Sequence, residues 1–366
     1  MKTLHANSFQ KNRSSNIDLL RVLAIIAVIM IHYNNDDIGG GNKYVAPHSL
    51  NQFVLYSIQS LCVSAVNVFV ILSGYCSFKR DYLNIAKPLK LLITLYAFRF
   101  LMLFVSLFVS QENFTPMDIF VRLLPNNWYI TLFIVLYILS PWLNLLLKTL
   151  EDYSKMFILV FFALFSVWPT LTDLIQNLTA VQNYGMSSVG LYGSMDGYTI
   201  VNFVLLYFIG ASINNSNYKK LSLKGIAFKL LIVFVMLVGW SYLYPLTGLR
   251  LHKSAWSYCN PLLIYEAYLL VILFLKISIP PSSIISYMAK GTLTVFLLHT
   301  SFLVRIDTSE AVNGSTWYML LHIAATLLSV FSACMAVHVI WDFVTKRLWH
   351  LLDSKQWHIK IRQNQL

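Results

Sequence analysis

Long apolar segments recur along almost the whole chain, and they constrain its fold more than any other feature. A helix of about 18 apolar residues is long enough to cross ~30 Å of hydrocarbon. Such segments lie near residues 17–34, 54–75, 91–110, 128–147, 156–175, 199–213, 226–244, 258–276, 284–304 and 317–344, the sixth being the shortest. Inside a bilayer the backbone must satisfy its own hydrogen bonds, which a continuous helix does. The pattern predicts an all-α, polytopic integral membrane protein with these ten segments as transmembrane helices.

Composition agrees with a membrane class. Hydrophobic residues make up 57% of the chain and charged residues 11%, with a mean hydropathy of +0.64. Soluble domains contain about one quarter charged residues. The net charge of +12 would suggest a nucleic-acid partner in a soluble protein, but here it is better explained by membrane topology. We therefore expect no nucleic-acid partner, and the lipid bilayer as the protein's surroundings.

The basic residues are distributed unevenly between the two sides of the predicted membrane. If the first helix starts in the cytoplasm, most lysines and arginines fall inside, and few, such as Lys43 and Arg122, fall outside. That asymmetry orients membrane proteins and predicts cytoplasmic N- and C-termini. We expect one transmembrane domain over residues 1–350, a short basic cytoplasmic tail over 351–366 and no appended soluble domain. The expected location is the plasma or inner membrane of the cell.

Two polar residues stand out on the first apolar segment, IDLLRVLAIIAVIMIHY. Arg21 and His32 are eleven helical steps apart, which turns the helix by ~1100°, or three turns plus only ~20°, and advances it by ~16.5 Å. Both side chains therefore lie on one helix face, at opposite ends. Either residue alone could simply meet the headgroups or water at its end of the helix.

A long anionic donor with a narrow neutral arm fits this spacing, and acyl-coenzyme A is such a molecule. Arg21, on the cytoplasmic side, offers a fixed charge and forked donors for its phosphates. The thioester would extend along the helix face toward His32. An apolar wall disfavours imidazolium, so His32 is expected to be neutral and able to accept a proton from a hydroxyl nucleophile.

Four motifs occur in order along the chain. They are the Arg and His of NIDLLRVLAIIAVIMIH, FVILSGY at 69–75, NNWYITLFIVLYILSPW at 126–142 and AKGTLTVFLLH at 289–299. Together they resemble membrane-bound acyltransferase family 3. The resemblance spans nearly the whole chain. It implies transfer of an acetyl group from acetyl-coenzyme A to a hydroxyl of a saccharide or lipid-linked glycan of the cell envelope. It implies no metal, and assembly into a homo-oligomer is left open.

The resemblance and the residue chemistry together suggest roles for further residues. Catalysis is assigned to His32, as base or transient acyl carrier. The predicted donor-binding residues are Arg21, Ser73, Gly74, Tyr75, Lys87, Lys90 and Lys290, and the predicted acceptor-binding residues are Trp128, His299 and Glu266. Alternatives stay open: Ser73 and Gly74 also suit helix packing, and Tyr75 and Trp128 also suit an interfacial belt.

The chain departs from the family pattern in two places. Relatives commonly have two arginines after the Ser-Gly motif, where this chain has Lys87 and Lys90. Lysine attracts phosphate as a point charge but lacks the guanidinium fork. Many relatives have a histidine before the tryptophan, and this chain has Asn127 there.

A second class of function fits part of the sequence. Ten helices with Arg99 and Glu266 at membrane depth would also suit a transporter or flippase of an anionic or polyprenyl-linked substrate. Neither two symmetric halves nor a matching pair of broken helices appears in the sequence, which favours the acyltransferase.

Overall fold

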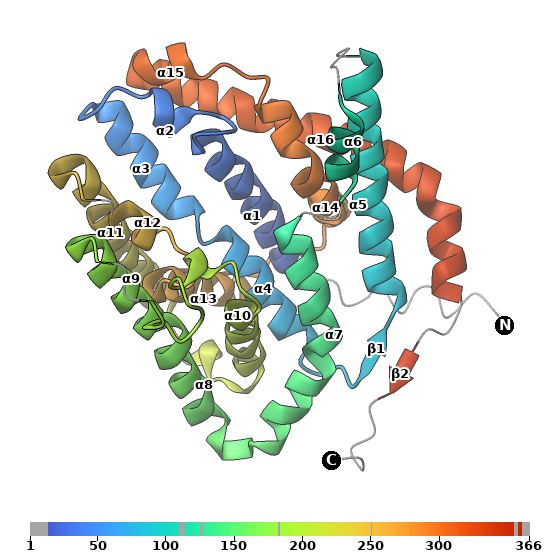
Figure 1. The fold of residues 1–366 in the computed structure, drawn as a ribbon. Coiled ribbons are helices and arrows are strands. Elements are labelled where there is room, and N and C mark those ends of the chain that lie inside the picture. The colour runs from blue at the N-terminus through green and yellow to red at the C-terminus, as the bar shows by residue number, and fades with distance from the viewer. Residues whose placement is uncertain are drawn as a thin grey trace. The chain divides into compact units, whose positions relative to one another are not determined.

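The computed structural model describes residues 14–109, 114–124, 127–181, 184–249, 251–354 and 358–360. Asn126 of the predicted motif, residues 1–13 of the predicted domain, and residues 355–357 and 361–366 of the predicted tail lie outside this set. The described chain is almost entirely helical (Figure 1). This confirms the all-α polytopic class. The number of crossings and the side of each terminus stay predictions.

The α-helices are α1 Ser15–Asn34, α2 Gly41–Tyr44, α3 Leu50–Cys62, α4 Ala65–Ser77, α5 Ala86–Phe104, α6 Pro116–Leu123, α7 Trp128–Thr149, α8 Ser154–Phe162, α9 Trp168–Thr179, α10 Ile200–Ser212, α11 Leu223–Thr247, α12 Leu251–Ala255, α13 Pro261–Lys276, α14 Ser283–Leu303, α15 Ser309–Asn313 and α16 Thr316–Ser354. Two π-helical turns are η1 Val105–Val109 and η3 Ala163–Val167. Four 3-10 turns are η2 Glu151–Tyr153, η4 Met195–Gly197, η5 Ile213–Asn215 and η6 Tyr218–Lys220. Strands β1 Tyr82–Asn84 and β2 His358–Lys360 pair antiparallel, with Leu83 opposite Ile359.

All ten predicted apolar segments are helical. Among the described residues, seven stretches are long and apolar enough to cross a membrane, by length and composition: Ser15–Asn34, Leu50–Ser77, Ala86–Phe108, Pro116–Thr149, Glu151–Thr179, Leu223–Thr247 and Thr316–Ser354. The protein is therefore a multi-pass membrane protein.

The structure differs from the predicted boundaries at several points. The segment predicted at 54–75 is two helices, because a turn at residues 63–64 separates α3 from α4. The segment predicted at 156–175 contains the π-turn η3, which ends two residues before Pro169, whose nitrogen cannot donate a backbone hydrogen bond. The last helix continues through the predicted boundary at residue 344 to Ser354.

The predicted single domain divides into two compact units. Unit 1 holds the described residues up to Phe69, with Asn217–Tyr242 and Tyr265–His338. Unit 2 holds Val70–Ser216, Leu243–Ile264 and the described residues from Val339 onward. The described part of the predicted tail contributes the end of α16 and strand β2 to unit 2.

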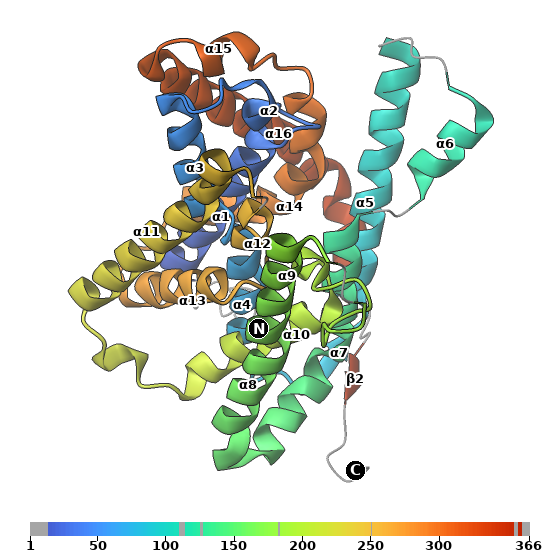
Figure 2. The same cartoon turned by 60° about the vertical axis from the view of Figure 1, so that its left-hand side comes forward.

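In unit 1, α1 packs along α14 and against α3, with α2 and α15 beside one another (Figures 1 and 2). The start of α1 is tied down by polar contacts. The side-chain amide of Asn16 donates hydrogen bonds to the backbone carbonyls of Phe274 and Ile277 over 2.7 and 3.1 Å. The backbone amide of Ser282 donates to the Ser15 hydroxyl over 2.9 Å. These bonds fix α1 relative to the end of α13 and the start of α14.

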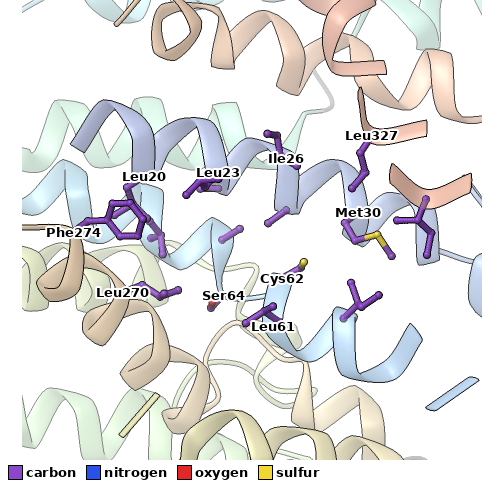
Figure 3. A pocket seen from close by; sticks show the side chains of 16 residues that line it. Leu20, Leu23, Ile26, Met30, Leu61, Cys62, Ser64, Leu270, Phe274 and Leu327 are labelled. Atoms are coloured by element: carbon purple, nitrogen blue, oxygen red, sulfur yellow. The ribbon is translucent and has the colours of Figure 1, made fainter. Parts of the chain in front are cut away.

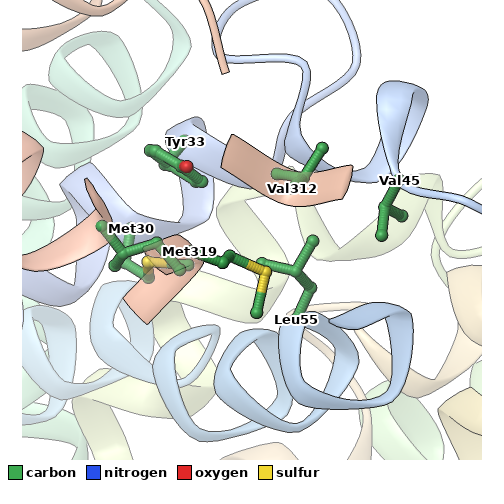
Figure 4. Packing of buried hydrophobic residues seen from close by; sticks show 7 residues of the cluster. Met30, Tyr33, Val45, Leu55, Val312 and Met319 are labelled. Carbon is green, nitrogen blue, oxygen red and sulfur yellow. The ribbon is translucent and has the colours of Figure 1, made fainter. Parts of the chain in front are cut away.

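The other end of α1 is held by a buried apolar cluster (Figure 4). Its members come from α1, the following segment, α3, α15 and α16: Met30, Tyr33, Val45, Leu55, Val312, Met319 and Ile323. The Tyr33 ring is fully buried, and its hydroxyl lies 2.9 Å from Nδ1 of His322. Because both ends of α1 are fixed, the face with Arg21 and His32 has a defined orientation.

Candidate functional site

The first focus of the site lies near the start of α1, where Asp18 and Arg21 form an ion pair. Nη1 of Arg21 is 3.1 Å from Oδ1 of Asp18, three residues earlier on the helix. Oδ2 of Asp18 accepts a hydrogen bond of 2.9 Å from the Ser286 hydroxyl of α14. Asp18 is fully buried, whereas 30% of the Arg21 side chain is exposed. Asp18 thus orients a guanidinium that remains accessible to an anion.

The second focus lies near the far end of the same helix, where two histidines meet. Nε2 of His299 lies 3.1 Å from Nδ1 of His32, and the rings are edge-on at 74° with centroids 4.7 Å apart. His299 comes from α14 and is only 2% exposed, while His32 is partly exposed. The structure therefore brings together two residues that the sequence predicted separately, His32 as the catalytic group and His299 as an acceptor-binding group.

An apolar groove of about 370 Å³ runs along α1 in unit 1 (Figure 3). Its walls include Leu23 and Met30 of α1, Leu61 of α3 and Phe274 of α13. Leu23 and Met30 are turned by about 180–200° from Arg21 around the helix axis. The groove is therefore on the face of α1 opposite to the Arg21–His32 face.

Glu266 and Lys290 belong to unit 1 but lie in contrasting surroundings. Glu266 of α13 is 1% exposed, and its Oε2 has no hydrogen-bond partner among the described residues. Its side chain is not part of the groove wall. Lys290 of α14 is exposed, one helical turn beyond Ser286. Its charge therefore lies on the same helix as Ser286, which contacts Asp18.

In unit 2, two cations lie over one aromatic ring, and a third cation is close to them in sequence. The Arg80 guanidinium and Nζ of Lys87 lie 5.3 and 5.8 Å from the centroid of the Tyr137 ring. Lys90 lies one turn after Lys87 on α5, and its Nζ forms a 2.7 Å ion pair with Asp353. Because that carboxylate already satisfies Lys90, Arg80 and Lys87 are better placed to attract an anion.

The loop that carries Arg80 is held by a buried amide. The Asn144 side chain of α7 donates to the carbonyls of Ser77 and Arg80 over 2.8 and 2.9 Å, and its Oδ1 accepts from the Tyr207 hydroxyl over 2.7 Å. Nη1 of Arg80 is buried without a hydrogen-bond partner among the described residues. Arg80 was not among the site residues predicted from sequence. Its position in the loop after the Ser-Gly motif was the available signal.

The predicted Ser73-Gly74-Tyr75 segment lies at the end of α4. A Cβ built on Gly74 would lie 2.1 Å from the Tyr207 carbonyl oxygen of α10, so the missing side chain lets the two helices approach closely. Gly210 has the reciprocal role, because its Cβ would lie 2.0 Å from the Ile71 carbonyl oxygen. Of the two interpretations of Gly74, the geometry supports helix packing. Ser73 and Tyr75 are partly exposed.

Trp128 opens α7 as part of an aromatic cluster in unit 2. Its ring stacks at 27° on Tyr258 with centroids 5.9 Å apart, and meets Tyr198 edge-on at 4.3 Å. Asn127 caps the helix by accepting from the Ile130 amide over 3.0 Å, a structural role at the position where many relatives have histidine. Trp128 is therefore held by ring contacts with Tyr198 and Tyr258, and Asn127 by its capping hydrogen bond.

An acidic residue lies beside this cluster. Asp196 is close enough to Tyr198 and Asp173 to influence them electrostatically. Burial and then the Asp173 carboxyl raise the pKa of Asp196, against the opposite effect of Lys253. Aromatic faces beside carboxylates can pack on and hydrogen-bond to a hydroxylated ring.

No three His, Cys, Asp or Glu side chains come together to hold an ion within the described ranges. The imidazoles of His32 and His299 can supply acid–base or nucleophilic chemistry at the end of α1.

Comparison with known proteins gives one match. Residues 14–339 match the family model described as an acyltransferase domain. That range contains both histidines, Arg21 and the basic cluster of unit 2. No curated protein and no solved structure gives a significant match.

Proposed function

The chain belongs to membrane-bound acyltransferase family 3, and from that premise we propose that it transfers an acetyl group from cytoplasmic acetyl-coenzyme A to a hydroxyl of a saccharide acceptor. The observation that carries the proposal is the polar face of α1, with an accessible, carboxylate-oriented Arg21 at one end and His32 at the other. The protein is an acyltransferase. Its donor, its acceptor and the plasma or inner membrane as its location are our proposals.

Basic residues in each unit support an anionic donor. In unit 1, Arg21 offers its guanidinium to phosphate, with Lys290 as an exposed charge on α14. In unit 2, Arg80 and Lys87 provide cations around Tyr137, with Lys90 neutralised in part by Asp353. We propose that each of these basic groups, taken by itself, binds phosphate of an anionic donor.

Acceptor binding is assigned to aromatic and polar groups in unit 2. Trp128 and Tyr198 form the aromatic part, and Asp196 offers a carboxylate to hydroxyl donors. A saccharide suits such a surface because its ring packs on aromatic faces while its hydroxyl groups donate hydrogen bonds. A lipid-linked glycan would present the same chemistry at the membrane.

His32 supplies the chemistry. In direct transfer its imidazole removes the acceptor's hydroxyl proton, the oxygen attacks the thioester carbon, and the C–S bond breaks. The coenzyme A thiolate then takes the proton from the imidazolium. In a two-step route the imidazole itself carries the acetyl group between donor and acceptor. Trapping a labelled enzyme by rapid acid quench distinguishes the two routes.

The test uses the full-length protein in nanodiscs, with labelled acetyl-coenzyme A and the isolated envelope glycans of the producing cell. We expect Arg21→Ala to weaken donor binding, and His32→Ala to bind donor normally but release no coenzyme A when glycan is added. Indifference of wild-type protein to acetyl-coenzyme A would contradict the proposal and favour the transporter. Equal donor affinity in Arg21→Ala and wild type would contradict the assignment of Arg21.

A further inference from the structure

The protons of the His32–His299 pair can be assigned from the groups around them. Nδ1 of His299 lies 2.9 Å from the Val295 carbonyl oxygen. A carbonyl oxygen only accepts, so this nitrogen carries a proton. An imidazolium is costly at a site that is 2% exposed, and the neutral ring holds a single proton. Nε2 of His299 is therefore bare and acts as an acceptor.

The same reasoning then fixes His32. Its Nδ1 lies 2.9 Å from the Val28 carbonyl oxygen and 3.1 Å from the bare Nε2 of His299. Both neighbours accept, so Nδ1 of His32 carries the proton. In the neutral ring the lone pair is then on Nε2. No backbone or side-chain group of the described residues forms a hydrogen bond with that Nε2.

We propose that His299 is a positioning residue that acts through His32 and makes Nε2 of His32 the nitrogen that takes the acceptor's proton. The proposal rests on the proposed acyl transfer. When Nε2 gains the hydroxyl proton, the Nδ1–H group of the resulting imidazolium makes a charge-assisted hydrogen bond to Nε2 of His299. The proton on Nε2 later passes to the departing thiolate. A base held by a third group in this way follows the general logic of catalytic triads.

This role differs from contact between His299 and the acceptor. One His299 nitrogen is engaged by Val295 and the other by His32, and the ring is almost completely buried. A contact with the acceptor would require His299 to give up one of these bonds. The geometry therefore points to an effect on the reactivity of His32, with little effect on substrate affinity.

The first experiment measures the tautomer directly. Protein with ¹⁵N- and ¹³C-labelled histidine is reconstituted in liposomes, and His32 is assigned by comparison with His32→Ala in solid-state NMR. We expect the proton of His32 on Nδ1 and a bare Nε2. A proton on Nε2 with a bare Nδ1 would overturn the proposal.

The second experiment compares two replacements of His299. In His299→Gln the amide oxygen can still accept from Nδ1–H of His32, whereas the similarly sized His299→Met lacks a strong acceptor. We expect kcat within about threefold of wild type for Gln and a fall of about tenfold or more for Met, as loss of roughly one hydrogen bond implies. KM for acetyl-coenzyme A should be unchanged in both. Equal kcat in the two variants, whether normal or lost, would contradict the positioning role.

A matched control is provided by another partly exposed histidine of unit 1, His322 on α16. His322 bonds to Tyr33, and its contacts among the described residues are with Tyr33 and Tyr318. His322→Met should therefore leave kcat within about twofold of wild type, since no transition-state interaction is removed. Thermal unfolding of each variant checks that it folds. If wild type releases no coenzyme A, the proposed function fails while the NMR result still tests the tautomer. If wild type is active but His32 shows the opposite tautomer, only the positioning proposal fails.

Discussion

Gly74 offers a quantitative test of whether the Ser-Gly motif packs helices or borders a ligand. An alanine Cβ at this position would lie 2.1 Å from the Tyr207 carbonyl oxygen and 3.0 Å from the Ala211 amide nitrogen. A carbon–oxygen contact needs about 3.3 Å, so α4 and α10 would have to separate locally by about 1 Å. Both clashing atoms belong to the backbone and cannot rotate away. The substitution therefore disturbs the helix pair itself.

The expected cost follows from overpacking. Added methyl groups in tight cores cost about 1–3 kcal/mol, and a backbone clash places Gly74→Ala at about 3 kcal/mol. Replacing helical glycine by alanine returns about 1 kcal/mol of intrinsic preference. The free energy of unfolding should therefore fall by about 2 kcal/mol, the difference between the two effects.

Gly239 of α11 is the matched control, because a Cβ there meets nothing within 4 Å. Gly239→Ala should raise the free energy of unfolding by up to about 1 kcal/mol. The assay is reversible unfolding in mixed micelles with increasing SDS, followed by acetyl-coenzyme A affinity of the folded fraction. Equal stability of the two variants would refute the packing argument. Unchanged stability with weakened donor affinity in Gly74→Ala would show instead that Gly74 borders the donor.

Three further predictions concern ligand binding. Arg80→Ala should weaken acetyl-coenzyme A binding about tenfold, as expected for one lost charge-assisted bond. Lys90→Ala should change the affinity only about twofold, because Asp353 already pairs with Lys90. Isothermal titration gives both affinities, and a larger loss in Lys90→Ala than in Arg80→Ala would contradict the argument. Arg21→Lys should keep part of the affinity that Arg21→Ala loses, since lysine retains the charge without the fork. Equal affinity of Arg21→Lys and wild type would exclude the bidentate contact. Trp128→Ala should raise KM for the glycan about tenfold through lost stacking and leave donor Kd unchanged, which competition binding would check.

The features that depend on local periodicity were predictable from the amino-acid sequence alone. The length and apolar composition of each segment indicated helices, and all ten segments are helical. The spacing of Arg21 and His32 fixed their common face, because a helix turns by the same angle at every residue. The ordered motifs predicted the family, which the match over residues 14–339 confirms.

The side-chain contacts between distant helices could not be derived from helical periodicity. His32 and His299 are 267 positions apart, and Asp18 and Ser286 are 268 apart. Arg80 is a surface-type residue in sequence, and only the fold brings it over the Tyr137 ring beside Lys87. The His32–His299 and Asp18–Ser286 contacts have no local sequence signal, because each joins α1 to the distant α14.

The packed helices also supply the neighbours of residues whose roles the sequence left open. The sequence allowed Gly74 to border a ligand or to pack helices, and the close approach of the Tyr207 carbonyl favours helix packing. The proposed position of the His32 proton on Nδ1 depends on Val28 and His299, which both lie beside that nitrogen. Helical periodicity sets the direction of a side chain from its own helix, whereas its hydrogen-bond partners depend on which helices pack together, and that is fixed by close contacts distributed over the whole chain.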